Sequence, residues 1–344
     1  LLVSGEPYAG ERTWRNILKS DSAVELVHFT ILRPPDKQDF VPVFELSLIA
    51  FPTQELFMEK VDEFDLIIFD RYERRGILPP AYFANITRYV RDGGALLITG
   101  GDEFAGPDSL FRTALRDVLP VVPTARVIEE GFHPRVSELG ARHPVTEALA
   151  DHAPRPAAED GTPGWGRWFR LAEVEAERGQ TVMQGPDERP LLVLDRVGKG
   201  RIAMLASDHA WLWSRGYEGG GPHLELLRRL AHWMMGEPEL EEEALTASTD
   251  AGEVTVTRRS LASTVPPLRA EAPGGTVTEL AMTEVSPGRF QTRFAGGETG
   301  VWRLGNGDLT GIAVVGPAAP REFENPVATG EMLRPLADAT RGAV

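Results

Sequence analysis

Two segments of the chain place polar side chains directly after an apolar run, where a sheet can present them for chemistry. In the first, residues 93–102 (GGALLITGGD), the apolar run is followed by two glycines and an acid. Glycines at this point permit a tight strand-to-helix turn, which presents one side chain at the carboxyl edge of a sheet. The presented residue is Asp102, or Gly101 if the register shifts by one. A carboxylate there can serve as a base or a nucleophile, and the alternative is an aspartate that only caps the turn.

The second segment, residues 197–209 (VGKGRIAMLASDH), also ends in polar residues. Its Gly-Lys-Gly sequence predicts a hairpin that returns a buried strand. That strand ends in Ser207, Asp208 and His209, so it brings a hydroxyl, a carboxylate and an imidazole to its end. His209 is a candidate general base, and Ser207 is a candidate nucleophile beside it. The alternative is a structural histidine buried among core tryptophans.

Further residues are expected at this edge as ligand contacts. Asp70 and Arg71 directly follow the apolar run 65–69, although a solvated loop is the alternative there. Trp213 and Glu218 follow His209 closely enough to wall a pocket. The expected ligand-binding residues are Asp70, Arg71, Gly101, Asp102, Asp208, His209, Trp213 and Glu218.

The sequence favours neither a metal site nor a bound cofactor. Cysteine is absent, which removes thiolate ligands, and no His-Glu-x-x-His pattern occurs. A metal site would have to combine His209 with Asp208, His223 or Glu225, which is a weak set. The segment GEPYAG at 5–10 lacks the glycine spacing of a dinucleotide-binding loop. The other histidines expected at the surface are His133, His143 and His152.

Composition excludes several classes of protein. The chain has 344 residues, enough for two or three domains, and its net charge of −15 argues against a general nucleic-acid binder. The absence of cysteine excludes disulfides and a Cys nucleophile. No apolar run approaches the roughly 18 residues of a membrane span. Because the chain opens on Leu1 in a strand-like run, we expect a fragment whose membrane anchors lie outside it.

The first 240 residues alternate between apolar runs and helical patterns, which predicts an α/β domain with a doubly wound, mostly parallel sheet. Residues 153–168 are rich in Pro, Gly and Ala and predict an exposed excursion. The acidic run 239–243 predicts a solvated linker. Helices are expected at 11–19, 55–61, 80–91, 109–119 and 222–235.

After about residue 244 the pattern changes to alternating polar and apolar residues, punctuated by Gly- and Pro-containing turns. This texture predicts a small antiparallel β-sandwich, of immunoglobulin-like type, over 245–320. The expected organisation is therefore an α/β domain at 1–240, the β-sandwich, and a C-terminal segment at 321–344 that leads to residues outside this chain.

Taken together, the run 65–70, the elbow 93–102 and the hairpin 198–209 resemble the class I glutamine amidotransferase-like fold, and they occur in its order. The resemblance implies a flavodoxin-like sheet, with the family's nucleophile near Gly101 or Asp102 and its catalytic histidine near His209. Amidotransferases of this type use a cysteine, and this chain has none. The resemblance therefore implies a degenerate domain that does not hydrolyse glutamine by that mechanism.

A second resemblance covers nearly the whole chain. The motifs GEP at 5–7, GERTWRN at 10–16, FDRY at 69–72, GFHPR at 131–135 and SDHAWLW at 207–213 are similar to those of uncharacterised bacterial membrane proteins of the aerotolerance type. That similarity implies an N-terminal double-transmembrane segment, a C-terminal membrane helix and a periplasmic location in the cell envelope.

Two functions are consistent with these observations. The first is a non-catalytic module of a cell-envelope membrane protein that binds a small ligand or a protein, with no nucleic acid and with membrane attachment through segments outside this chain. The second is a hydrolase that uses Asp102 or Ser207 with His209. The second requires those side chains to converge within hydrogen-bond reach.

Overall fold

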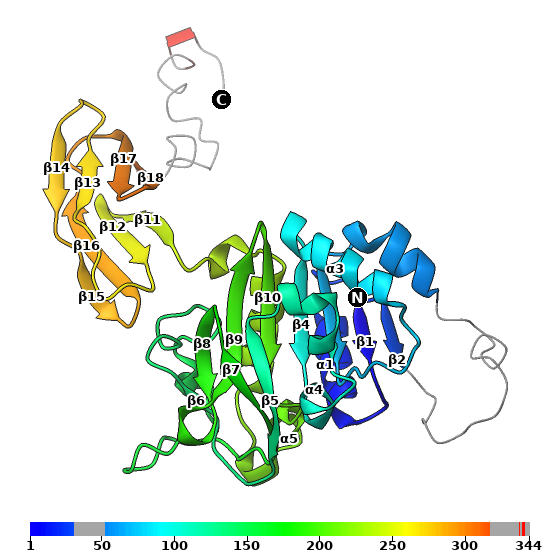
Figure 1. Ribbon diagram of the computed structural model, residues 1–344. Helices are drawn as coiled ribbons and strands as arrows, with labels where there is room; N and C mark the ends of the chain where they lie inside the picture. Colours follow the sequence, from blue (N-terminus) through cyan, green and yellow to red (C-terminus); the bar gives the residue numbers. More distant parts are fainter. Residues whose placement is uncertain (31–51, 317–336, 338, 341–344) are drawn as a thin grey trace. The chain divides into compact units, whose positions relative to one another are not determined.

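The computed structural model describes residues 1–30 and 52–316, together with 337, 339 and 340. The chain divides into two compact units, Leu1–Glu242 and Glu243–Val344. Figure 1 draws both units, which are described separately below. Most of the C-terminal segment expected at 321–344 lies outside the described residues.

The first unit is built on an eight-stranded mixed sheet in the order β2-β1-β3-β4-β10-β9-β8-β6 (Figure 1). The five strands from β2 to β10 pair in parallel, and β9, β8 and β6 extend the sheet beyond β10 by antiparallel pairing. The strands are β1 (Leu2–Ser4), β2 (His28–Thr30), β3 (Leu66–Asp70), β4 (Ala95–Thr99), β6 (Arg135–Val136), β8 (Gln180–Gln184), β9 (Pro190–Val197) and β10 (Gly200–Leu205).

The centre of this sheet is fully covered. Every residue of β3, β4 and β10 is buried, as expected for parallel strands with both faces packed. The α-helices of the unit are α1 (Ala9–Ser20), α3 (Pro80–Asp92), α4 (Asp102–Ala105), α5 (Ala210–Ser214) and α6 (His223–Met234). A separate two-stranded antiparallel sheet pairs β5 (Val121–Ile128) with β7 (Leu171–Ala176).

Two expected helices differ in the structure. The pattern at 109–119 forms two 3-10 turns, Leu110–Arg112 and Ala114–Asp117, because the Thr113 side chain accepts the Leu115 N–H and starts a new turn in mid-segment. The pattern at 55–61 forms a short π-helix, Glu55–Glu59, followed by a 3-10 turn, Val61–Glu63.

The excursion predicted at 153–168 is exposed only in its first part. Trp165 and Trp168 are 3% and 0% exposed, and their rings lie 5.6 and 4.8 Å from that of Trp213. The prediction of an exposed segment is wrong here, because burying two indoles outweighs the local preference of Pro and Gly for loops.

The acidic run at 239–243 is not a solvated linker. Glu241 and Glu242 form ion pairs with Arg196, and Glu242 is 7% exposed. His143, expected at the surface, is fully buried beside Glu242, with 3.5 Å between its Nε2 and Oε1 of the glutamate. Charge complementarity with Arg196 holds Glu241 and Glu242 on the α/β unit.

The second unit contains two four-stranded antiparallel sheets, β11-β12-β16-β15 and β14-β13-β17-β18. Val254 and Val256 of the first sheet and Leu268, Trp302 and Leu304 of the second share one hydrophobic core, as in a sandwich. The strands are β11 (Ala244–Asp250), β12 (Glu253–Arg259), β13 (Leu268–Glu271), β14 (Val277–Leu280), β15 (Thr283–Ser286), β16 (Arg289–Ala295), β17 (Gly300–Asn306) and β18 (Leu309–Val315).

Among the described residues, no helix is both long enough and apolar enough to cross a membrane.

Candidate functional site

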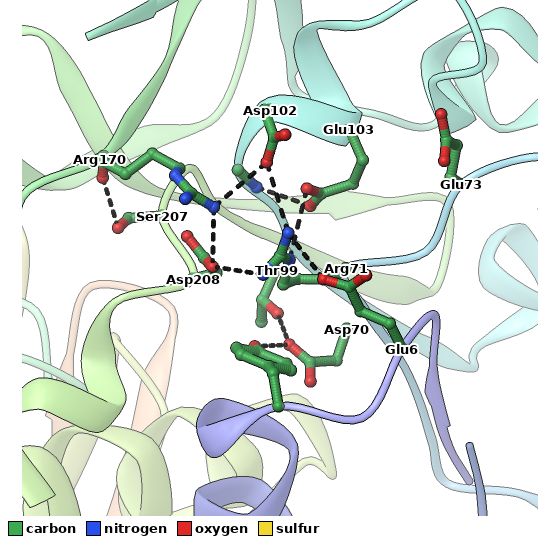
Figure 2. Close-up of polar contacts among 12 residues, drawn as sticks. Glu6, Asp70, Arg71, Glu73, Thr99, Asp102, Glu103, Arg170, Ser207 and Asp208 are labelled. Carbon is green, nitrogen blue, oxygen red and sulfur yellow. Dashed lines mark hydrogen bonds and ion pairs between the residues drawn. The ribbon is translucent and has the colours of Figure 1, made fainter. Parts of the chain in front are cut away.

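The carboxyl ends of β3, β4 and β10 meet at one edge of the sheet, and polar side chains gather there (Figure 2). Asp70 and Arg71 come from the end of β3, Asp102 from the turn after β4, and Ser207 and Asp208 from the end of β10. The elbow and the hairpin predicted from the sequence therefore do bring their polar residues to a common edge.

At the elbow, the side chains of Arg170 and Asp208 pack closely against Gly101. A Cβ atom built at Gly101 would lie 2.9 Å from Cδ of Arg170 and 3.0 Å from Oδ1 of Asp208, so a larger residue there would have to displace these two side chains. Asp102 is the first side chain that the turn presents, at the start of α4.

Arg71 is the central cation of the cluster. Its Nη2 lies 2.9 Å from Oε1 of Glu6 and 3.5 Å from Oδ1 of Asp102, and its Nη1 lies 3.3 Å from Oδ2 of Asp208. The Nε atom is 3.7 Å from Oε2 of Glu103. One guanidinium thus links acids that follow β1, β4 and β10.

Arg170 is the second cation, and it lies just before β7. Its Nη1 donates to Oδ1 of Asp102 at 3.2 Å and to Oδ2 of Asp208 at 3.3 Å. Asp102 is 60% exposed at its side chain, whereas Asp208 is 2% exposed, so Arg170 spans from the surface to the interior of the cluster. Asp102 is therefore held by two arginines (Figure 2).

Asp70 lies beneath the arginines and is fully buried. Tyr8 and Thr99 both donate their hydroxyls to Oδ1, at 2.6 and 2.5 Å, and the buried Oδ2 has no hydrogen-bond partner. Burial raises the pKa of Asp70 to about 6, against the opposing effect of the two hydrogen bonds.

Glu103 is the other acid whose protonation is altered. Its Oε1 accepts the Gly101 N–H at 2.6 Å, and its Oε2 is buried without a hydrogen bond. Burial raises the pKa of Glu103 to about 8, and the hydrogen bond from Gly101 and the charge of Arg71 only partly oppose this. At neutral pH Glu103 is therefore mainly uncharged.

Ser207 is buried and has structural partners on both sides. Its Oγ donates to the Arg170 carbonyl at 2.6 Å and accepts the His209 N–H at 3.2 Å. The hydroxyl proton points to a backbone carbonyl, which is not a base that could activate it as a nucleophile.

His209 is also tied to the backbone. Its Nδ1 accepts the Phe169 N–H at 3.1 Å, which leaves the proton of the neutral imidazole on Nε2. Nε2 lies 3.8 Å from Oδ1 of Asp208, and burial lowers the pKa of the imidazole. Within the described residues no hydrogen bond or ion pair joins His209 to Asp102.

Two residues expected to wall a pocket lie elsewhere. Trp213 is 2% exposed, belongs to the hydrophobic core, and donates its indole N–H to the Gly166 carbonyl at 2.7 Å. The three tryptophans pack on one another, which agrees with the alternative of core tryptophans rather than with a pocket wall. Glu218 pairs with Arg167 at 2.5 Å, and this ion pair lowers its pKa to about 2.

Four members of the cluster were not among the candidates, namely Glu6, Tyr8, Glu103 and Arg170. Glu6 and Tyr8 lie shortly after strand β1. Their position after an apolar run could have indicated them, as it indicated Asp70. Arg170 has no such local signal, because it reaches Asp102 across 68 positions of sequence.

The cluster is compact rather than hollow. A cavity beside it has a volume of about 10 Å³, which is room for a single water. Its lining residues include Tyr8, Thr99, Ser207 and Asp208. Among the described residues, no group of three or more His, Asp or Glu side chains could hold a metal ion.

Comparison with known families supports the amidotransferase-like character of this region. Residues 62–218, which include the ends of β3, β4 and β10, match the family model GATase1_like, described as "Putative glutamine amidotransferase". A search of curated proteins finds no match.

Several solved structures align with part of this chain at TM-scores below 0.5. Cytoplasmic protein STM3548 from Salmonella typhimurium is 17% identical with a TM-score of 0.48, and the alignment covers 68% of this chain and 98% of that one. Cytoplasmic protein STM1381 from Salmonella typhimurium LT2 is 17% identical with a TM-score of 0.49 and the same coverage. A β-galactosidase from Rahnella sp. R3 is 15% identical with a TM-score of 0.34, over 68% of this chain and 33% of that one.

Proposed function

We propose that this chain is a non-catalytic module that binds a small ligand or a protein partner at the edge formed by β3, β4 and β10. The observation that carries the proposal is the state of Asp102. It stands at the elbow, where the amidotransferase resemblance expects a nucleophilic cysteine, and its carboxylate is ion-paired with Arg71 and Arg170. Guanidinium groups do not accept a proton, so these contacts do not pair Asp102 with a group that could act with it in acid–base catalysis.

The partners of the other candidate groups support the same proposal. Ser207 donates to a carbonyl and His209 accepts an amide N–H, so both are used to hold the loop after β10 in place. The hydrolase alternative needs Asp102 or Ser207 to share a proton with His209. The contacts of these three residues do not favour it.

Exposure indicates where a partner would contact the module. Asp102 is 60% exposed and Glu6 is 39% exposed at their side chains, whereas the arginines beneath them are about one-fifth exposed. A ligand or protein at this edge would meet an acidic rim. It would gain most from cationic or hydrogen-bond-donating groups.

The proposal also places the module in the extramembrane part of a bacterial cell-envelope protein, on the periplasmic side. This part rests on the resemblance of the motifs 10–16 and 207–213 to the aerotolerance-type membrane proteins. Fractionation of the source cells, with an antibody raised against this chain, tests it. Recovery of the antigen in the membrane fraction is expected, and recovery only in the soluble fraction would contradict it.

Binding is tested by a thermal-shift screen of small ammonium, guanidinium and amide compounds with the wild-type chain. Hits are then repeated with Asp102→Asn and with Asp151→Asn, an exposed aspartate outside the cluster. The proposal expects the ligand-induced shift to fall in Asp102→Asn and to persist in Asp151→Asn. Hits that respond equally to both substitutions would contradict binding at this edge.

A further inference from the structure

A hollow in the first unit, lined by other residues than those of the acidic edge, has the opposite charge. It has a volume of about 410 Å³, within the range of small-molecule sites. It is lined by the end of α4, the two 3-10 turns at 110–117 and the middle of β5. The lining residues are Ala105, Gly106, Phe111, Arg112, Thr113, Arg116, Pro123 and Ala125.

This hollow contains two positive charges and no acidic side chain. In the part of the chain that the structure describes, neither Arg112 nor Arg116 takes part in an ion pair. Two guanidinium groups left without a counter-charge in a concave surface attract an anion.

The two arginines are held by defined local structure. Ser109 and Thr113 cap the two 3-10 turns, accepting the N–H groups of Phe111 and Leu115. The guanidinium of Arg116 lies over the ring of Phe111, 5.2 Å from its centroid. This cation–π contact holds Arg116 beside the hollow. It uses the face of the guanidinium, so the N–H groups at the edge of the guanidinium plane can still donate hydrogen bonds.

The opposite wall is a distorted stretch of β5. The pairing of β5 with β7 shifts register between Pro123 and Val127, and Ala125 adopts a φ of 62°. An alanine in the left-handed region is an unfavourable conformation, and such residues cluster at binding sites. The distortion places Pro123 and Ala125 as an apolar wall of the hollow.

We propose that this hollow binds a small phosphorylated molecule. Its phosphate lies between Arg112 and Arg116, where two planar guanidinium groups can each donate paired hydrogen bonds. Its apolar or aromatic part lies against Phe111 and Pro123. The site is separate from the acidic edge, so this inference does not depend on the function proposed for Asp102.

Phenyl phosphate is the probe, titrated calorimetrically into the whole chain at low ionic strength. Inorganic phosphate and benzoate are titrated separately for comparison. Inorganic phosphate has the anion without the ring, and benzoate has the ring with a carboxylate in place of the phosphate. We expect one phenyl phosphate per chain, bound about tenfold more tightly than either comparison compound, because charge-assisted hydrogen bonds and apolar contact both contribute.

Three variants locate the binding. Arg112→Gln/Arg116→Gln removes the cations, and Arg12→Gln/Arg15→Gln is the matched control, with two exposed arginines of α1. Gly106→Phe fills the hollow without changing charge; a Cβ at Gly106 would lie 3.5 Å from the nearest atom, an ordinary contact. Circular dichroism and the melting temperature establish that each variant is folded.

The proposal expects affinity for phenyl phosphate to fall at least about tenfold in both pocket variants and to stay within about twofold in the control. It is overturned if the wild type shows no saturable binding. It is also overturned if the control loses as much affinity as the pocket variants, which would indicate non-specific attraction of anions. Tighter binding of benzoate than of phenyl phosphate would replace the phosphate assignment with a carboxylate one.

Discussion

Oδ1 of Asp102 lies 3.2 Å from Nη1 of Arg170, so the residue presented by the elbow is held by a cation from a segment 68 positions away. The same nitrogen also contacts Asp208. This arrangement makes the elbow part of a charge network that joins strand ends, in which Asp102 contacts arginines rather than His209. The predictions below test the network, the buried acids within it and the consequences for activity.

Loss of Arg71 is expected to destabilise the first unit strongly. Arg71→Met would leave the buried Asp208 with Arg170 as its remaining cation, at a cost of up to about 3 kcal/mol in the free energy of unfolding. Urea unfolding of the variant measures this.

A second substitution separates charge from packing in that experiment. In Arg71→Met/Asp208→Asn the buried charge that has lost Arg71 is removed, so at least half of the lost stability is expected to return. Equal stability of the single and double variants would show that the ion pair does not carry the effect.

Asp70 is expected to make the chain less stable as the pH rises. In the unfolded chain this carboxyl has its ordinary pKa of 3.8, whereas in the folded chain burial raises the pKa to about 6. Between these values the folded state holds more protons, so the free energy of unfolding falls as pH rises, by on the order of 3 kcal/mol.

Asp70→Asn removes this titration. Melting temperatures are measured from pH 4 to pH 7. The melting temperature of the variant minus that of wild type should therefore increase between pH 4 and pH 6 and stay constant above pH 6. Asp151→Asn, at an exposed site, should run parallel to wild type. A constant difference between Asp70→Asn and wild type over this range would contradict a raised pKa for Asp70.

Glu103 is also expected to make the chain less stable as pH rises, but over a higher pH range. Its pKa is about 8 in the folded chain against an ordinary 4.5, so its contribution to stability falls as pH rises from 4.5 to 8. Glu103→Gln should match wild type near pH 5 and exceed it in melting temperature at pH 9. Glu138→Gln, which is exposed, provides the control. A variant less stable than wild type at pH 9 would refute the assignment.

Glu242 is expected to act in the opposite direction. The neighbouring His143 and Arg196 outweigh the effect of burial and hold the pKa of Glu242 at about 2, below the ordinary 4.5, so the stability it contributes is complete above pH 4.5 and lost as pH falls towards 2. Glu242→Gln should cost about 3 kcal/mol at pH 7 and progressively less below pH 4. Unfolding curves at pH 3 and pH 7 measure this, with the exposed Glu177→Gln as control; an equal loss at both pH values would exclude the ionic explanation.

The elbow and the β9–β10 hairpin could be predicted because their signals are local. An apolar run followed by Gly100 and Gly101 specifies both a buried strand and the turn after it, and Gly198 and Gly200 specify the hairpin. Once parallel strands are expected, the meeting of Asp70, Asp102 and Asp208 at one edge follows from topology.

The remaining features depend on contacts that a linear pattern does not contain. Arg170 reaches the site only because the antiparallel part of the sheet and the β5–β7 pair bring the start of β7 beside β10. The burial of Trp165 and the pairing of Glu242 with Arg196 likewise come from long-range packing, which overrides loop-like or solvent-exposed local composition.

The most direct test of the non-catalytic proposal is turnover. The wild-type chain is incubated with glutamine and with a panel of amide and ester substrates, beside Asp102→Asn, His209→Ala and the double variant. The account predicts that wild type and all three variants release product at the same background rate. Product release by wild type that either single substitution lowers by about 100-fold, the scale of a lost acid–base group, would contradict it.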